Sequence, residues 1–163
     1  MKMHIDWAAH IQDRLEIMVA GPEDYTPIAF ISFVLDKEKE HAHWQECVDV
    51  IYRLLKSGIL KFTEYAGDDS PVIREPIELA QALASQNPFS DDEWIQAKEV
   101  PHWYIPLLST TDMGKTLMRK HGLDKFGITP LCIALIDEIE ILFEEAGVAW
   151  SQEPLIPVGR RYR

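Results

Sequence analysis

The spacing of apolar residues along the chain predicts a mostly helical protein. In several segments apolar side chains recur every three or four positions, which places them on one face of a helix. Start and stop signals support these helices: Asp6 can cap the first one, Pro27 and Pro130 suit first helical turns, and Gly122 and Gly147 follow last turns. The predicted helices cover residues 6–20, 28–35, 44–58, 76–87, 94–100, 112–121 and 130–146.

Short strands are predicted between the helices. Residues 59–65 and 72–75 are separated by a turn-forming stretch, which is typical of a hairpin, and 102–109 is a candidate third strand. The predicted fold class is therefore mainly α with a small β-hairpin or sheet (α+β) in a single domain. The helix and hairpin at 40–75 resemble the corresponding part of winged-helix proteins, so we expect a winged-helix-like segment there.

The composition is that of an ordered globular domain. The 163 residues are 47% hydrophobic, which suffices for one domain over 1–163 with its own core. The apolar runs at 28–35 and 131–136 are too short to cross a bilayer, and the first residues lack the apolar core of a signal peptide. Residues 150–163 are interrupted by prolines and end in three arginines, so we expect a flexible basic C-terminal tail.

The two cysteines, Cys47 and Cys132, both have apolar neighbours in the sequence. Two small buried thiols suit a reducing compartment better than a disulfide framework, so we expect a cytoplasmic protein. Cys132 lies near the start of the last predicted helix, where the helix dipole can activate a thiol, and four histidines, His4, His10, His102 and His121, are candidates to approach it in space. Nothing in the sequence brings any of them to the cysteine, so we expect a buried, inert cysteine.

The stretch EHAHWQE at 40–46 resembles a metal site, because His41 and His43 are followed by Glu46. Two histidines one residue apart share a face only on a strand, whereas on a helix they point about 200° apart. The apolar spacing that follows is helical, so we expect these histidines to begin a helix and to bind no metal.

A second stretch, residues 109–116, resembles the end of a phosphate-binding loop, but Ser109 stands where the first glycine belongs. It is better explained as the start of a helix, with Gly114 and Lys115 in its first turn. The sequence therefore predicts no cofactor, and we find no motif that identifies an enzyme.

The charge of the chain opposes nucleic-acid and membrane partners. Lys and Arg number 16 against 27 Asp and Glu, which gives a net charge of -11 and would repel phosphates. In the winged-helix-like segment, the helix carries Glu46 and Asp49 against Arg53 and Lys56. The turn of the hairpin presents two further aspartates where a DNA-binding protein would present basic residues.

The acidic residues are concentrated in patches that could bind a basic protein. The predicted partner-binding residues are Asp137, Glu138, Glu140, Glu144 and Glu145 on the last helix, Asp68 and Asp69 in the hairpin turn, and Asp91, Asp92 and Glu93 at a helix cap. A solvated helix face that keeps the protein soluble would explain the same pattern.

In size, acidity and lack of catalytic motifs, the chain is similar to bacterial immunity proteins, including those of contact-dependent growth inhibition. The resemblance implies an acidic protein-binding module that neutralises a basic, nuclease-type toxin domain by covering it. Two alternatives remain open: a winged-helix transcriptional regulator or adaptor, and an unrecognised enzyme. The sequence leaves the oligomeric state undetermined.

Overall fold

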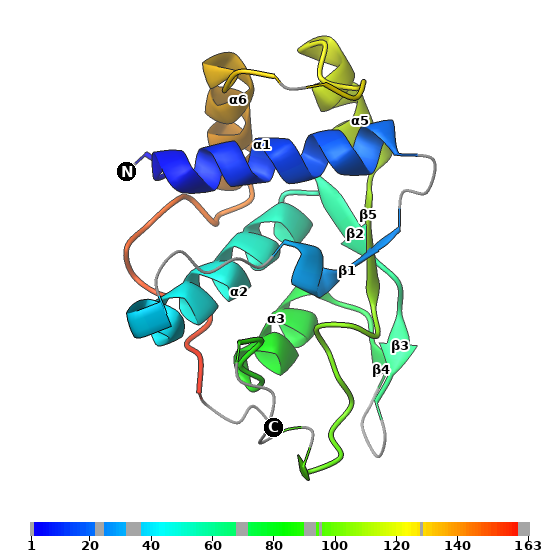
Figure 1. Ribbon diagram of the computed structural model, residues 1–163, viewed down its shortest axis with the longest axis vertical. Coiled ribbons are helices and arrows are strands. Elements are labelled where there is room, and N and C mark those ends of the chain that lie inside the picture. Colours follow the sequence, from blue (N-terminus) through cyan, green and yellow to red (C-terminus); the bar gives the residue numbers. More distant parts are fainter. Residues whose placement is uncertain are drawn as a thin grey trace. The chain divides into compact units, whose positions relative to one another are not determined.

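The structure is a computed structural model that describes residues 2–21, 25–31, 37–67, 72–89, 94, 96–127 and 129–159. It confirms a mainly helical α+β protein (Figure 1). The helices are α1 (Ile5–Ala20), α2 (Glu40–Lys56), α3 (Pro76–Ala84), α5 (Asp112–Lys120) and α6 (Ile133–Glu145). The strands are β1 (Thr26–Pro27), β2 (Leu60–Phe62), β3 (Tyr65–Ala66), β4 (Val72–Ile73) and β5 (Leu107–Thr110).

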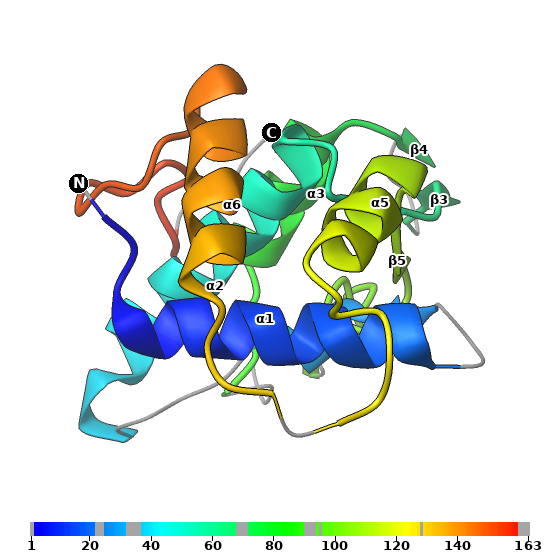
Figure 2. The same cartoon turned by 90° about the horizontal axis from the view of Figure 1, so that it is seen from above.

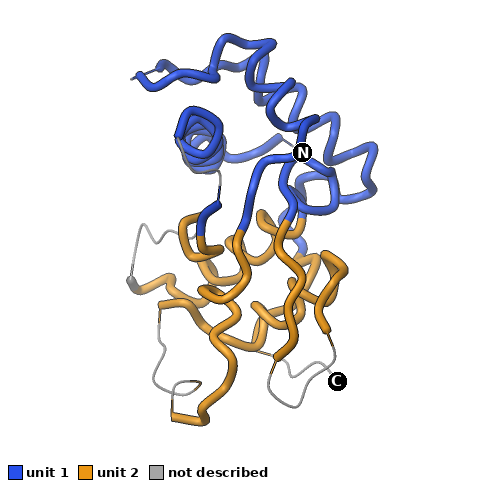
Figure 3. The backbone as a smooth tube through the Cα atoms, turned by 90° about the vertical axis from the view of Figure 1, so that its right-hand side faces the viewer, with its two compact units in different colours: residues 1–26, 53–61, 108–153 blue, residues 27–52, 62–107, 154–163 orange. Residues whose placement is uncertain are grey.

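The chain divides into two compact units, which Figure 3 colours separately. Unit 1 consists of residues 1–26, 53–61 and 108–153 and contains α1, α5 and α6. Unit 2 consists of residues 27–52, 62–107 and 154–163 and contains α3, most of α2 and the β3–β4 hairpin. Each unit is assembled from three separate stretches, so neither is a continuous segment. The expectation of one domain over 1–163 stays a prediction.

Unit 1 has a core formed by its three helices. In Figure 2, α5 and α6 stand on the same side of α1. Apolar side chains at helical spacing supply this core, which explains why the sequence pattern identified these helices. The buried residues include Trp7, Ile11 and Leu15 of α1, Leu117 and Met118 of α5, and Leu135, Ile139 and Phe143 of α6.

Four predicted helix starts differ from the structure, and α2 is one of them because it begins at Glu40 rather than at residue 44. The N-cap of α1 is His4, whose Nδ1 accepts from the N–H of Asp6, so Asp6 itself lies in the first turn. Helix α6 begins at Ile133 rather than at Pro130. Residues 26–27 form β1 instead of capping a helix, and only a 3₁₀ turn, Ile28–Phe30, follows; residues 32–36 lie outside the described part of the chain. Strand pairing thus overrides the proline signal at Pro27.

The strands form two small sheets. The predicted strand over 59–65 is divided: β2 belongs to a three-stranded sheet of order β1-β5-β2, whereas β3 pairs with β4. The β3–β4 ladder is antiparallel, with Tyr65 opposite Ile73, which confirms a helix followed by a hairpin. The third strand begins at Leu107 rather than at residue 102.

Residues 155–158 of the predicted tail form hydrogen bonds within unit 2. The carboxylate of Asp49 accepts from the N–H groups of Leu155 and Ile156 at 3.2 and 3.0 Å. Gln45, one turn earlier on α2, donates to the carbonyl of Ile156 at 2.8 Å and accepts from the N–H of Val158 at 2.9 Å. Ile156 and Val158 are also buried, so these residues pack within unit 2. The flexibility of the whole segment 150–163 stays a prediction. Residues 160–163, which include the three terminal arginines, lie outside the described part of the chain.

Within the described stretches, none of the helices is both long enough and apolar enough to cross a membrane.

Candidate functional site

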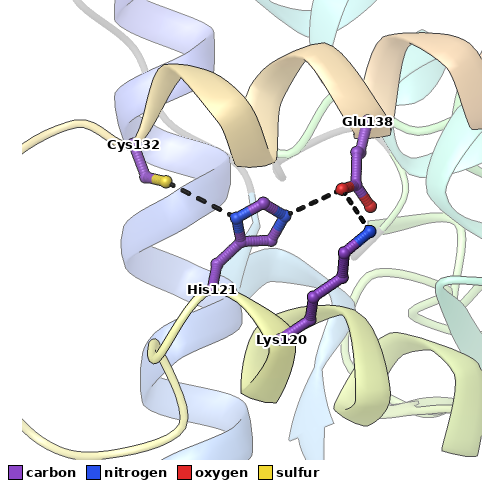
Figure 4. Close-up of polar contacts among 4 residues, drawn as sticks. All are labelled: Lys120, His121, Cys132 and Glu138. Atoms are coloured by element: carbon purple, nitrogen blue, oxygen red, sulfur yellow. Dashed lines mark hydrogen bonds and ion pairs between the residues drawn. The ribbon is translucent and has the colours of Figure 1, made fainter.

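Three side chains that can exchange a proton meet where α5 ends and α6 begins (Figure 4). Sγ of Cys132 lies 3.9 Å from Nδ1 of His121, within hydrogen-bonding reach for sulfur. On the far side of the ring, Nε2 of His121 lies 3.2 Å from Oε1 of Glu138. A thiol, an imidazole and a carboxylate therefore follow one another, and these are the residue types that activate nucleophiles in many enzymes.

The end of α5 positions His121. Gly122 follows the histidine in a left-handed conformation, with φ of 69°, and the N–H of Leu123 donates to the carbonyl of Met118. These contacts satisfy the last carbonyls of the helix and turn the chain away from it. The imidazole of His121 consequently packs within unit 1, and only 11% of the side chain is exposed.

A buried glutamine of α1 positions Cys132. Oε1 of Gln12 accepts from the N–H of Cys132 at 2.7 Å, and Nε2 of Gln12 donates to the carbonyl of Pro130 at 3.0 Å. The amide of Gln12 thereby fixes the backbone on both sides of Leu131. Cys132 is the N-cap residue of α6, and its side chain turns toward His121 (Figure 4).

Electrostatic contacts keep the carboxylate of this cluster ionised. Nζ of Lys120 lies 2.6 Å from Oε1 of Glu138. The hydrogen bond from Lys120 is the main cause that lowers the pKa of Glu138, and the charges of Lys120 and His121 act in the same direction. Glu138 can therefore stabilise a positive charge on the His121 ring.

A groove of about 380 Å³ lies beside this cluster, between α5 and α6. Its lining includes the apolar side chains of Met113 and Leu117 from α5 and of Ile141 and Leu142 from α6. Met113 and Ile141 are 38% and 52% exposed, although both are large hydrophobic residues. The groove is therefore an apolar surface open to a ligand or partner in unit 1.

Charged residues border the same groove. Glu138 and Glu145 lie seven positions apart on α6 and so share one face of the helix, and Lys120 faces them from α5. Lys120 is already paired with Glu138, so its charge does not offset that of Glu145. The border of the apolar groove is thus acidic on its α6 side.

The acidic residues of α6 that were predicted to bind a partner lie in different environments. Asp137, Glu144 and Glu145 are exposed. Glu138 belongs to the histidine cluster, and Oε1 of Glu140 accepts from the backbone N–H of Met3. Asp68, Asp69, Asp91, Asp92 and Glu93 lie outside the described residues, so their part in a docking surface stays a prediction.

The cysteines differ from one another. Cys47 is buried, as the sequence predicts, but Cys132 is partly exposed, so the expectation of burial is wrong for Cys132. That this thiol is inert stays a prediction. Eleven positions separate Cys132 from His121, and a loop joins them, so helical or strand periodicity could not show that they meet. The available signals were a histidine just before a C-terminal glycine and a cysteine at a helix start.

The stretches that resemble a metal site and a phosphate-binding loop, residues 40–46 and 109–116, both contain a helix start, as predicted. His41 and His43 both lie in α2, where His41 is exposed and His43 is buried, so they face different environments. In the other motif, Oγ1 of Thr111 caps α5 by accepting from the N–H of Gly114 at 3.0 Å. A Cβ atom at Gly114 would lie 2.4 Å from the carbonyl oxygen of Ile59, so this glycine permits close backbone packing.

Unit 2 contains a separate titratable pair. The hydroxyl of Tyr65 and Nδ1 of His102 are 2.5 Å apart. Burial raises the pKa of the Tyr65 hydroxyl, and burial lowers the pKa of His102, partly offset by the charge of Glu99. The backbone N–H of His102 is held by Oε1 of Gln86 at 3.0 Å. This pair joins the hairpin to the 102–106 segment and has the character of a structural contact.

Comparison with known proteins gives no relative: no family matches the chain, and neither a curated protein nor a solved structure resembles it significantly.

Proposed function

We propose that the chain is an acidic protein-binding module that docks a basic protein in the groove between α5 and α6. In the narrower form of the proposal it is an immunity protein, and the partner is a basic, nuclease-type toxin domain. The observation that carries the proposal is the groove itself, which combines exposed apolar side chains with an acidic border.

The apolar part of the groove supports binding rather than a purely structural role. Ile141 and Met113 remain exposed in unit 1, and covering such side chains is what gives stable complexes their affinity. A partner segment with an aliphatic or aromatic side chain would fill a groove of this size. The proposed occupant is a helix or loop that presents one such side chain between lysines or arginines.

The charge distribution supports a basic occupant. Glu145 lines the groove, and the exposed Asp137 and Glu144 extend negative charge beyond it. The whole chain carries a formal charge of -11, which attracts a positively charged partner from a distance and speeds association. In a toxin complex, these carboxylates would occupy the place of nucleic-acid phosphates.

One contact argues against a DNA-reading helix in the winged-helix-like segment. Arg53 is 2% exposed and donates to the carbonyls of Val148 and Ala149, so its positive charge is not available to phosphates. Asp49 is also buried, so it neither repels nor binds DNA. An interaction module is therefore the better proposal for this segment.

The test is capture of partners from the source cells with the wild-type protein and with the variant Ile141→Asp. Proteins retained by the wild type and lost by the variant are identified by mass spectrometry and purified. We expect such a protein to be basic and to bind Ile141→Asp at least about tenfold more weakly, because an apolar anchor residue would lose its contacts.

Ile105→Asp is the matched control, since Ile105 is 51% exposed and lies in unit 2. Equal binding of the purified partner to both variants, or capture of only acidic proteins or nucleic acid, would contradict the docking proposal. Expression of the partner in cells tests the narrower form: its toxicity should be relieved by the wild type and not by Ile141→Asp.

A further inference from the structure

The cluster of Cys132, His121 and Glu138 supports an inference that does not depend on the docking proposal. We propose that Cys132 is a nucleophilic thiol whose proton is taken by His121, and that the site reacts with small peroxides. The product would be a sulfenic acid at Cys132, so the cluster is an oxidation site.

The geometry provides each requirement for proton removal. Nδ1 of His121 is the atom that faces Sγ, at 3.9 Å, and can accept its proton. The resulting imidazolium would be mostly buried, and a buried charge needs a partner. Oε1 of Glu138 provides that partner 3.2 Å from Nε2, and Lys120 keeps this carboxylate ionised.

The surroundings of the sulfur favour a peroxide over an acyl substrate. Acyl transfer needs N–H donors directed at the developing oxyanion, and the N–H of the nucleophilic residue often supplies one. In this structure the N–H of Cys132 is committed to Oε1 of Gln12 at 2.7 Å. Oxidation by a peroxide needs only access to the sulfur and a proton for the leaving group, and Cys132 is partly exposed.

The reaction balances with the groups present and one peroxide. The proton of Sγ moves to Nδ1 of His121, and the thiolate attacks the terminal oxygen of ROOH. The S–O bond forms as the O–O bond breaks, and the leaving alkoxide takes the proton from His121 to give ROH. The sulfur loses two electrons and the peroxide gains two, while the histidine returns to its neutral form.

The first experiment compares the two cysteines of the wild-type protein. Hydrogen peroxide is added at pH 7 with a sulfenic-acid trap, and labelling of Cys132 and Cys47 is followed by peptide mass spectrometry. We expect folded Cys132 to react on the order of tenfold faster than N-acetylcysteine. In urea its rate should fall to that of the free thiol, whereas the buried Cys47 should become more reactive.

This comparison separates activation from exposure, because a thiol that is merely accessible does not slow down on unfolding. A folded rate no greater than that of N-acetylcysteine, or a rise for Cys132 in urea, would overturn the proposal. Iodoacetamide provides a second readout of nucleophilicity. Fast alkylation without fast oxidation would overturn the assignment of peroxides as the substrate class.

Two variants test the roles of the neighbours. His121→Gln keeps a polar side chain but cannot hold the proton, so oxidation of Cys132 should fall at least about tenfold. Glu138→Gln should slow it less, because the histidine remains. His41→Gln, an exposed histidine of α2, is the matched control and should have no effect. An unchanged rate in His121→Gln refutes the proposal, and if that variant does not fold, the urea comparison of the wild type decides.

Discussion

Replacing Gly114 by alanine tests whether this glycine is needed for packing rather than for phosphate binding. An added Cβ would lie 2.4 Å from the carbonyl oxygen of Ile59, whereas ordinary contacts begin at 3.4 Å. The two backbones would therefore have to separate by about 1 Å. Ile59 is fully buried, and its carbonyl also accepts from the N–H of Thr111 at 3.1 Å, so this movement is resisted.

Competing effects decide the sign of the change in stability. Alanine in place of glycine favours a helix by about 1 kcal/mol. Forcing extra volume into a packed contact costs about 1–3 kcal/mol, and weakening the hydrogen bond to Ile59 costs about 1 kcal/mol more. We expect Gly114→Ala to lower the free energy of unfolding by about 2 kcal/mol, which corresponds to a decrease in Tm of roughly 4–8 °C for a chain of this length.

Urea and thermal unfolding followed by circular dichroism would measure this change. Thr116→Ala is the matched control, because Thr116 lies exposed in the same helix and its replacement adds no atom. The control should change the free energy of unfolding by no more than about 0.5 kcal/mol. A Gly114→Ala variant as stable as the wild type, or more stable, would refute the packing argument and leave helix propensity as the dominant effect.

Three further predictions concern polar residues that are buried or half-buried. Asp49→Ala removes the acceptor for the N–H groups of Leu155 and Ile156, so the free energy of unfolding, measured in urea, should fall by about 3 kcal/mol. A loss below about 1 kcal/mol would show that these hydrogen bonds do not stabilise the fold. Arg53→Lys keeps the charge but replaces two separate nitrogens of a planar guanidinium, which donate to the carbonyls of Val148 and Ala149, by a single nitrogen. We expect a loss of about 2 kcal/mol in the same assay, and an unchanged free energy of unfolding would contradict this role. Burial lowers the pKa of His102 below its ordinary value of 6.5, so the unfolded state binds a proton more readily and stability should fall as the pH drops below 6.5. His102→Asn should reduce this loss of stability between pH 7 and pH 5, and an identical pH dependence would show that His102 is not its source.

The sequence determined the helices whose buried faces have strong periodicity and whose ends carry local signals. Helix α5 is an example: the sequence predicts a cap at Thr111 or Asp112 and a C-terminal glycine at Gly122. In the structure Thr111 is the cap, and Gly122 follows the helix in a left-handed conformation. The start and end of a helix depend on residues a few positions apart, so the local sequence is enough to predict them. The fold class followed from the same patterns, and so did the helical setting of His41 and His43.

Tertiary structure decided the features that depend on distant segments. Pro27 follows a helix-start signal but lies in a strand, because β1 pairs within a three-stranded sheet. The proline-rich segment after residue 154 appeared flexible from its composition, yet Asp49 and Gln45 supply the hydrogen-bond partners that its backbone needs. Those partners lie about a hundred residues earlier in the chain, beyond the range of any local pattern.

The candidate site shows the same division. The sequence identified Cys132 and four histidines, His121 among them, as reactive residue types and the last helix as acidic. Only the folded chain shows that the end of α5 meets the start of α6, which places Oε1 of Glu138 beside Nε2 of His121. The distance between two side chains across a loop depends on the packing of the helices that flank it. That packing depends on all of the core contacts together, so no short sequence motif predicts it.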